Sequence, residues 1–153
     1  MKKQWKTLVI CIAIPLAVGV LSALLTRDSM QTFDTINKPK LSPPAWLFPA
    51  AWTILYILMG IASFLVVTSK KPNGSALITY GLQLIFNFFW SIIFFNKGLY
   101  LFAFIWLVIL WILILKTTVK FYRISKPAGY LMIPYLLWVT FAGYLNLAIS
   151  ILN

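Results

Sequence analysis

The sequence has 153 residues, and none of them is histidine or glutamate; its only acidic residues are Asp28 and Asp34. Its single cysteine is Cys11, so one chain alone has no partner for a disulfide. General acid–base pairs, Ser-His-Asp triads, carboxylate proton relays and His/Cys/carboxylate metal sites all lack their parts. These absences argue against a conventional hydrolase, a metal site and an ion-driven pump.

Charge is scarce as well. Charged residues make up 10% of the chain and hydrophobic residues 62%, whereas soluble domains are roughly 45–50% apolar. A soluble globule of this size covers its surface with many more polar groups. We therefore expect lipid to be part of the solvent around this protein.

The positions of the charges divide the chain. Five windows without a charged residue are 18 to 29 residues long, at 7–26, 41–69, 72–96, 98–115 and 127–153. A hydrocarbon core of about 30 Å needs about 20 apolar helical residues, so each window holds one span. The sequence predicts an all-α integral membrane protein, a single domain of five transmembrane helices near 7–26, 44–68, 76–95, 99–122 and 128–151.

The first window has a second interpretation, as a secretory signal peptide. Lys2, Lys3 and Lys6 precede an apolar stretch, as they would in such a peptide. However, the stretch is long for the apolar region of a signal peptide, and no clear small-x-small cleavage site follows before Arg27. Both features favour a retained membrane span.

Lysine and arginine residues predict the orientation. Nine of them flank the spans on the side of the N-terminus and four on the other side, which predicts a cytoplasmic N-terminus. The net charge is +11, but the basic residues are scattered over short loops beside the membrane. This distribution favours anionic lipid headgroups over nucleic acid as a partner.

Aromatic residues account for 17% of the chain, with 7 Trp, 7 Tyr and 12 Phe. Those near span ends, such as Trp5, Tyr100 and Tyr122, fit the aromatic belt of a membrane protein. Trp106 and Trp111 fit lipid-facing or packing positions equally well. The hypothesis of a ligand-binding pocket therefore depends on places where aromatic residues cluster with prolines, polar residues or small residues.

The first cluster combines prolines with aromatic residues. Four prolines between positions 39 and 49 interleave with Trp46, Trp52 and Tyr56. Proline fixes φ and removes a hydrogen-bond donor, so we expect a stiff loop and a helix start bent at Pro49. Trp52 and Tyr56 are four residues apart and share a helix face. The pattern fits both a kinked helix with belt aromatics and a ligand-binding segment.

The second cluster is a stripe of Gln83, Asn87 and Trp90 at helical spacing. Because an amide in lipid needs a partner, the stripe must point into the bundle. Asparagine in this position either links helices by hydrogen bonds or orients an otherwise apolar ligand. The sequence leaves both interpretations open.

The third cluster is a stripe of Trp138, Ala142 and Leu145, in which a large ring is followed by a small residue that leaves space beside it. In the first span, Gly19, Ser22 and Ala23 form a small-residue face. Such a face also fits close packing between helices.

At these residues the sequence resembles the TspO or translocator-protein family, also called tryptophan-rich sensory proteins and peripheral-type benzodiazepine receptors. The resemblance covers essentially the whole chain. Its most specific motifs are Ser42-Pro43-Pro44-x-Trp46 followed by Trp52-x-x-x-Tyr56-x-x-x-Gly60, Asn87-x-x-Trp90, and Pro134-Tyr135-Leu136-x-Trp138 followed by Leu145-Asn146.

The resemblance implies five helices around one pocket, a homodimer, and binding of porphyrins such as protoporphyrin IX and of synthetic benzodiazepine- or isoquinoline-type ligands, with no required cofactor. The first loop, 27–43, would close over the pocket as a lid together with the residues that follow it. The implied contacts are Gly19, Ser22, Ala23, Pro43, Pro44, Trp46, Trp52, Tyr56, Asn87, Trp90, Trp138, Ala142 and Leu145.

Two departures limit the resemblance. Animal members carry a C-terminal cholesterol motif with Tyr and Arg after the Leu-Asn pair, whereas here Leu147 follows Asn146 and no basic residue comes after it. Sterol binding at that site is therefore not expected. Many members also have an acidic residue in the fourth span, about where Trp106 stands.

Three functions follow from the resemblance. We favour a membrane receptor or sensor for porphyrin. The second is an enzyme that promotes light- and oxygen-dependent porphyrin degradation, with Trp52 and Trp138 as the candidate catalytic residues, because the ligand would supply the reactivity. The third is a transporter, although the sequence shows neither an inverted repeat nor a coupling carboxylate. Without an N-terminal transit segment, we expect a bacterial cell membrane.

Overall fold

The computed structural model describes residues 2–29, 35–44 and 46–153, with the side chains described from Gln4 onward. The helices are α1 (Lys2–Thr26), the 3-10 turn η1 (Arg27–Ser29), α3 (Leu47–Val67), α4 (Gly74–Ser91), the π-helical turn η2 (Ile92–Asn96), α5 (Tyr100–Ile124) and α6 (Lys126–Leu152). Within this part of the chain, five helices are long and apolar enough to cross a membrane. The predicted all-α fold with five membrane-spanning helices is confirmed.

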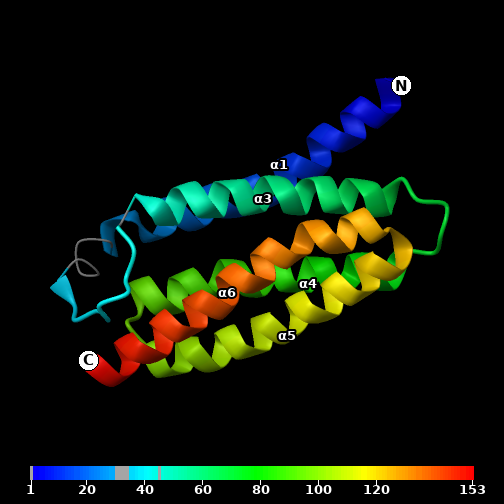
Figure 1. The fold of residues 1–153 in the computed structure, drawn as a ribbon. Coiled ribbons are helices and arrows are strands. Elements are labelled where there is room, and N and C mark those ends of the chain that lie inside the picture. The colour runs from blue at the N-terminus through cyan, green and yellow to red at the C-terminus, as the bar shows by residue number, and fades with distance from the viewer. Residues whose placement is uncertain (1, 30–34, 45) are drawn as a thin grey trace.

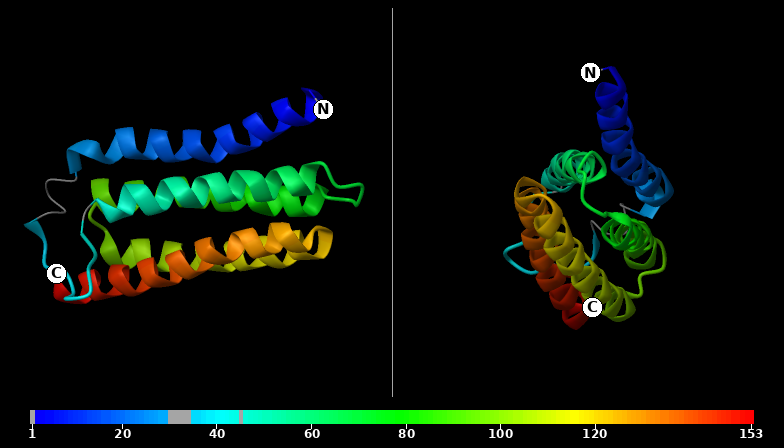
Figure 2. Two further views of the ribbon diagram at one scale, coloured as in Figure 1. Left: turned by 45° about the horizontal axis from the view of Figure 1, so that its top comes forward. Right: turned by 90° about the vertical axis from the view of Figure 1, so that its right-hand side faces the viewer.

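The helices form one elongated bundle (Figure 1). The N-terminal end, the α3–α4 connection and the α5–α6 connection lie at one end, and the segment before α3 lies at the other end with the last residues of α6. α5 packs against α4 and α6, while α1 packs mainly against α3 (Figure 2). The N-terminal end of α1 diverges from α3 (Figure 1), and the span of α1 is the least buried of the five membrane spans in the described part of the chain.

The helix ends differ from the predicted ranges. α1 begins at Lys2, α5 continues to Ile124, and α6 begins at Lys126. The charge-free windows mark the apolar part of each span, whereas backbone hydrogen bonding continues into the charged turns outside it. α3 begins at Leu47, later than the predicted residue 44. Pro43 and Pro44 lie outside the helix, because a proline disfavours helical backbone at the residue before it.

Pro49 is the third residue of α3. The N–H groups of a first helical turn have no intrahelical acceptor, so a proline there removes no hydrogen bond. Pro49 therefore breaks no helical hydrogen bond, which was the physical reason for the predicted bend. Pro15 in α1 and Pro134 in α6 lie beyond the first turn of their helices.

Gly60 sets the distance between α1 and α3. A Cβ atom at this position would lie 2.5 Å from the Cα atom of Ile12 and 2.8 Å from the carbonyl oxygen of Cys11. Both atoms belong to the α1 backbone, which does not move aside as a flexible side chain does. The close approach of the two helices therefore requires a glycine here.

We expect Gly60→Ala to separate α1 from α3 and to destabilise the protein by about 1–3 kcal/mol, the usual cost of overpacking. Cys11 is buried at this interface and is the sole cysteine, so its reaction with a thiol-reactive fluorophore during heating reports the separation. Gly81→Ala is the control, because a Cβ atom there meets nothing within 4 Å. Equal transition temperatures for the two variants would contradict the prediction.

Candidate ligand-binding site

A cavity of about 510 Å³ lies inside the bundle, in the half nearer the segment 35–44. Its size falls within the range of small-molecule sites, about 300–1,000 Å³. Its walls come from four parts of the fold and from the segment before α3. The lining residues are Leu16, Gly19, Val20, Ser22, Ala23 and Thr26 of α1, Phe48, Pro49, Trp52, Thr53 and Tyr56 of α3, Trp90, Ser91, Phe94 and Phe95 of α4 and η2, Trp138, Phe141, Ala142, Leu145, Asn146 and Ile149 of α6, and Lys38, Ser42 and Pro43.

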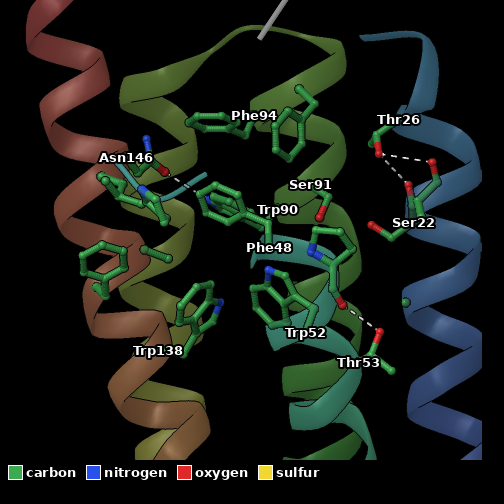
Figure 3. A pocket seen from close by; sticks show the side chains of 18 of the residues that line it. Ser22, Thr26, Phe48, Trp52, Thr53, Trp90, Ser91, Phe94, Trp138 and Asn146 are labelled. Atoms are coloured by element: carbon green, nitrogen blue, oxygen red, sulfur yellow. Dashed lines mark hydrogen bonds between the residues drawn. The ribbon is translucent and has the colours of Figure 1, made fainter. Parts of the chain in front are cut away.

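Aromatic rings form one wall of the cavity, and Figure 3 shows three tryptophans gathered around it. Trp52 stacks on Tyr56 with ring centroids 5.6 Å apart. Trp138 meets the edge of Phe48 at 6.0 Å, and Trp90 stacks on Phe94 at 5.2 Å. These pairs hold flat apolar surfaces in fixed orientations.

A second part of the wall carries small and hydroxyl-bearing side chains from α1 and α3. The Thr26 hydroxyl donates to the Ser22 carbonyl oxygen at 2.8 Å, and the Thr53 hydroxyl donates to the Pro49 carbonyl oxygen at 2.7 Å (Figure 3). These threonine donors are satisfied by their own helices. This wall is therefore less polar toward a ligand than its composition indicates.

Gly19 and Tyr56 close the cavity at its inner end. A Cβ atom at Gly19 would lie 2.5 Å from Cε2 of Tyr56, so the missing side chain lets the tyrosine ring lie against α1. Tyr56 itself is 5% exposed. The small-residue face of α1 thus serves helix packing here and borders the cavity one turn further on, at Ala23.

A hydrogen-bonded chain of buried side chains lies behind Tyr56. The Tyr56 hydroxyl donates to Asn87 Oδ1 at 2.9 Å, and Asn87 Nδ2 donates to the Tyr135 hydroxyl oxygen at 2.8 Å. The Tyr135 hydroxyl donates in turn to Gln83 Oε1 at 2.6 Å. The chain joins α3, α4 and α6 in the middle of the bundle, where water is not available to replace a lost bond.

Asn146 fixes the Trp90 ring. Trp90 Nε1 donates to Asn146 Oδ1 at 3.0 Å, and Asn146 Nδ2 donates to the carbonyl oxygen of Tyr100 at 2.8 Å. Trp138 differs, because its buried Nε1 atom has no hydrogen-bond partner within the described part of the chain.

Ten of the thirteen side chains implied by the family resemblance line this cavity: Gly19, Ser22, Ala23, Pro43, Trp52, Tyr56, Trp90, Trp138, Ala142 and Leu145. Pro44, Trp46 and Asn87 are not among the lining residues. Pro44 is exposed and Trp46 is 69% exposed, because both lie outside the first turn of α3. Asn87 is 3% exposed, and its amide is committed to two tyrosines.

Sequence reasoning missed several lining residues. Asn146 continues the stripe of Trp138, Ala142 and Leu145 on the same face of α6, so extending that stripe by one residue would have found it. Phe48 and Phe141 lie within the aromatic segments that were singled out, but their apolar surroundings gave no signal for the direction of their side chains. Trp106 stacks on Phe86 and donates to its carbonyl oxygen at 2.8 Å, so this tryptophan has a packing role.

Comparison with known proteins identifies the family. Residues 11–152 match the profile of the TspO/MBR family. The chain is 43% identical to "Tryptophan-rich protein TspO" of Chlorobaculum tepidum, covering 100% of this chain and 99% of that protein. It is 35% identical to "Tryptophan-rich sensory protein" of Cereibacter sphaeroides, with 100% and 95% covered, and 31% identical to "Translocator protein" of Bos taurus, with 95% and 89% covered. This integral membrane protein therefore belongs to the TspO/MBR family.

Proposed function

We propose that this protein is a membrane receptor or sensor that binds a porphyrin such as protoporphyrin IX in the 510 Å³ cavity. The observation that carries the proposal is the arrangement of Trp52, Trp90 and Trp138 around one cavity inside a membrane-spanning bundle. Synthetic benzodiazepine- and isoquinoline-type ligands, which are also flat and apolar, would compete for the same space. A homodimer remains part of the proposal.

The chemistry of the cavity suits an amphiphilic macrocycle. Stacked aromatic rings favour a flat apolar ligand, and the cavity buries it away from lipid and water. Lys38 lines the cavity and brings a positive charge to it, which suits a propionate carboxylate.

A titration of the protein in nanodiscs with protoporphyrin IX tests the proposal. We expect saturable changes in Soret absorbance and in tryptophan quenching, and displacement by an isoquinoline-type ligand. Binding that rises linearly with porphyrin and equals that of empty nanodiscs would contradict the receptor. Uptake of porphyrin into proteoliposomes would favour the alternative function, transport of porphyrin or another small amphiphile.

Degradation of the porphyrin is a second candidate function, and the shared position of Trp52 and Trp138 favours it. Both side chains line the same cavity, so both would contact one bound molecule. Light excites the porphyrin, dioxygen is the oxidant, and the two indoles would steer or relay the oxidation. Such a reaction needs no acid–base residue, in agreement with the absence of histidine and glutamate.

We expect Trp52→Phe and Trp138→Phe to slow the loss of Soret absorbance under illumination several-fold, while the Kd for porphyrin changes less. A phenyl ring keeps much of the stacking surface but lacks the oxidisable indole. Trp111→Phe is the matched control, because Trp111 lies outside the cavity and donates to the Thr140 hydroxyl. Identical decay in all three variants and in the unmodified protein would exclude a role for the two cavity tryptophans.

A further inference from the structure

The segment 35–44 supplies Lys38, Ser42 and Pro43 to the cavity lining. It also contacts the last residues of α6, beside which it lies (Figures 1 and 2). The N–H group of Asn37 donates to Asn153 Oδ1 at 3.2 Å, and Asn153 Nδ2 donates to the carbonyl oxygen of Asn37 at 2.9 Å. A longer bond of 3.5 Å joins Asn37 Nδ2 to the carbonyl oxygen of Leu152. The end of α6 thus holds this segment by three hydrogen bonds.

The pairing depends on a carboxamide at residue 153. One side-chain amide engages both backbone groups of Asn37, as neighbouring β-strands pair through the N–H and C=O of one residue. The Asn153 side chain is itself held in place, because Nδ2 also donates to the carbonyl oxygen of Ile149 at 2.9 Å. Alanine lacks both functions, and aspartate lacks the donor and brings a negative charge toward the Asn37 carbonyl oxygen.

The bonded residue lies next to the cavity lining. Lys38, which lines the cavity, follows Asn37 in sequence, and Ile36, which packs against the hydrophobic core, precedes it. α6 carries Trp138, Leu145 and Asn146, which line the same cavity. The bonds between Asn37 and the end of α6 therefore join two parts of the cavity wall, the segment 35–44 and α6.

We propose that Asn153 is a positioning residue that fastens the segment 35–44 to the end of α6 and so limits how often this part of the cavity wall moves away. Its effect on the exchange of porphyrin rests on the function proposed above, whereas its effect on the segment does not. Asn153 acts through the Asn37 backbone and is not itself a lining residue.

The first measurement needs no ligand. We expect Asn153→Ala in nanodiscs to increase the rate of tryptic cleavage after Lys40 about three- to tenfold, the change that the loss of a net hydrogen bond or two produces in an opening equilibrium. Cleavage between Lys70 and Lys71, at the other end of the bundle, is the internal reference and should not change. Asn37→Ala should have a smaller effect, because Asn153 bonds to the backbone of residue 37.

The second measurement is the dissociation rate of protoporphyrin IX in stopped-flow displacement, which should rise by a similar factor. Asn73→Ala is the matched control, since Asn73 also donates its amide to a backbone carbonyl, that of Val66, but in the α3–α4 connection. If Asn153→Ala affected only stability, its thermal transition would fall, but the rate of cleavage after Lys40 and the rate of porphyrin dissociation would both stay unchanged.

The outcomes separate the two proposals. Unchanged cleavage after Lys40 in Asn153→Ala overturns the role of Asn153, whatever the ligand. Faster cleavage with an unchanged dissociation rate also overturns it, because the fastened segment would then not limit exchange. If the unmodified protein shows no saturable porphyrin binding, the proposed function fails, and the cleavage rates alone decide the role of Asn153.

Discussion

Replacing Ala23 with phenylalanine is expected to abolish saturable porphyrin binding, with an apparent Kd raised at least about a hundredfold. Ala23 lines the cavity from α1, opposite the tryptophan wall. A phenyl ring projecting from this position occupies the space in which a macrocycle would stack, and close-packed walls do not yield to make room. Soret titration in nanodiscs measures the loss, and tryptophan quenching gives a second signal.

Ala17→Phe is the matched control for this variant. Ala17 lies on the same helix and is exposed, but it is not a lining residue. The two positions are six residues apart, about 1.7 helical turns, so their side chains lie on different faces of α1. We expect Ala17→Phe to bind porphyrin as the unmodified protein does. If Ala23→Phe still binds porphyrin, the ligand binds outside this cavity, and the proposed site is contradicted.

The sequence was sufficient to predict the spans, because the cost of burying charge in lipid is large and leaves an unambiguous pattern. Each window without charged residues corresponds to one membrane-spanning helix, and α3 shows how the remaining error arises. The window from 41 to 69 is apolar throughout, but Pro43 and Pro44 exclude helical backbone from its first residues. Hydropathy therefore finds the span, and local backbone chemistry sets where its helix begins.

The cavity walls were predictable to the extent that helical spacing assigns residues to a face. Trp138, Ala142 and Leu145 share one face of α6, and all three line the cavity. Helical spacing does not show, however, which residues of a face reach the cavity and which lie behind its wall. Asn87 and Trp90 lie on one stripe of α4, yet Trp90 lines the cavity and Asn87 lies behind its inner end. The neighbours that decide this, Tyr56 and Tyr135, come from other helices, and a single sequence does not pair them.

Asn87→Leu is the variant for which we expect the largest loss of stability, about 2–4 kcal/mol. Leucine fills a similar volume, so the effect comes from hydrogen bonds. The Tyr56 hydroxyl loses its acceptor and Tyr135 loses the donor Asn87 Nδ2, both in a buried site. Porphyrin affinity should fall about tenfold, because the ring that closes the cavity is no longer anchored. The thermal exposure of Cys11 measures the stability, and Soret titration measures the affinity.

A second substitution distinguishes this indirect role from a direct contact between Asn87 and the ligand. In the Asn87→Leu background, Tyr56→Phe removes the hydroxyl that was left without an acceptor and keeps the ring that stacks on Trp52. We therefore expect the double variant to be more stable than Asn87→Leu by about 1–2 kcal/mol, whereas Tyr56→Phe alone is destabilising. A direct ligand contact gives the opposite pattern: affinity falls without a loss of stability, and Tyr56→Phe restores neither. The sign of the coupling free energy between residues 56 and 87 therefore decides between two roles of Asn87: anchoring Tyr56 in the cavity wall, or direct contact with the ligand.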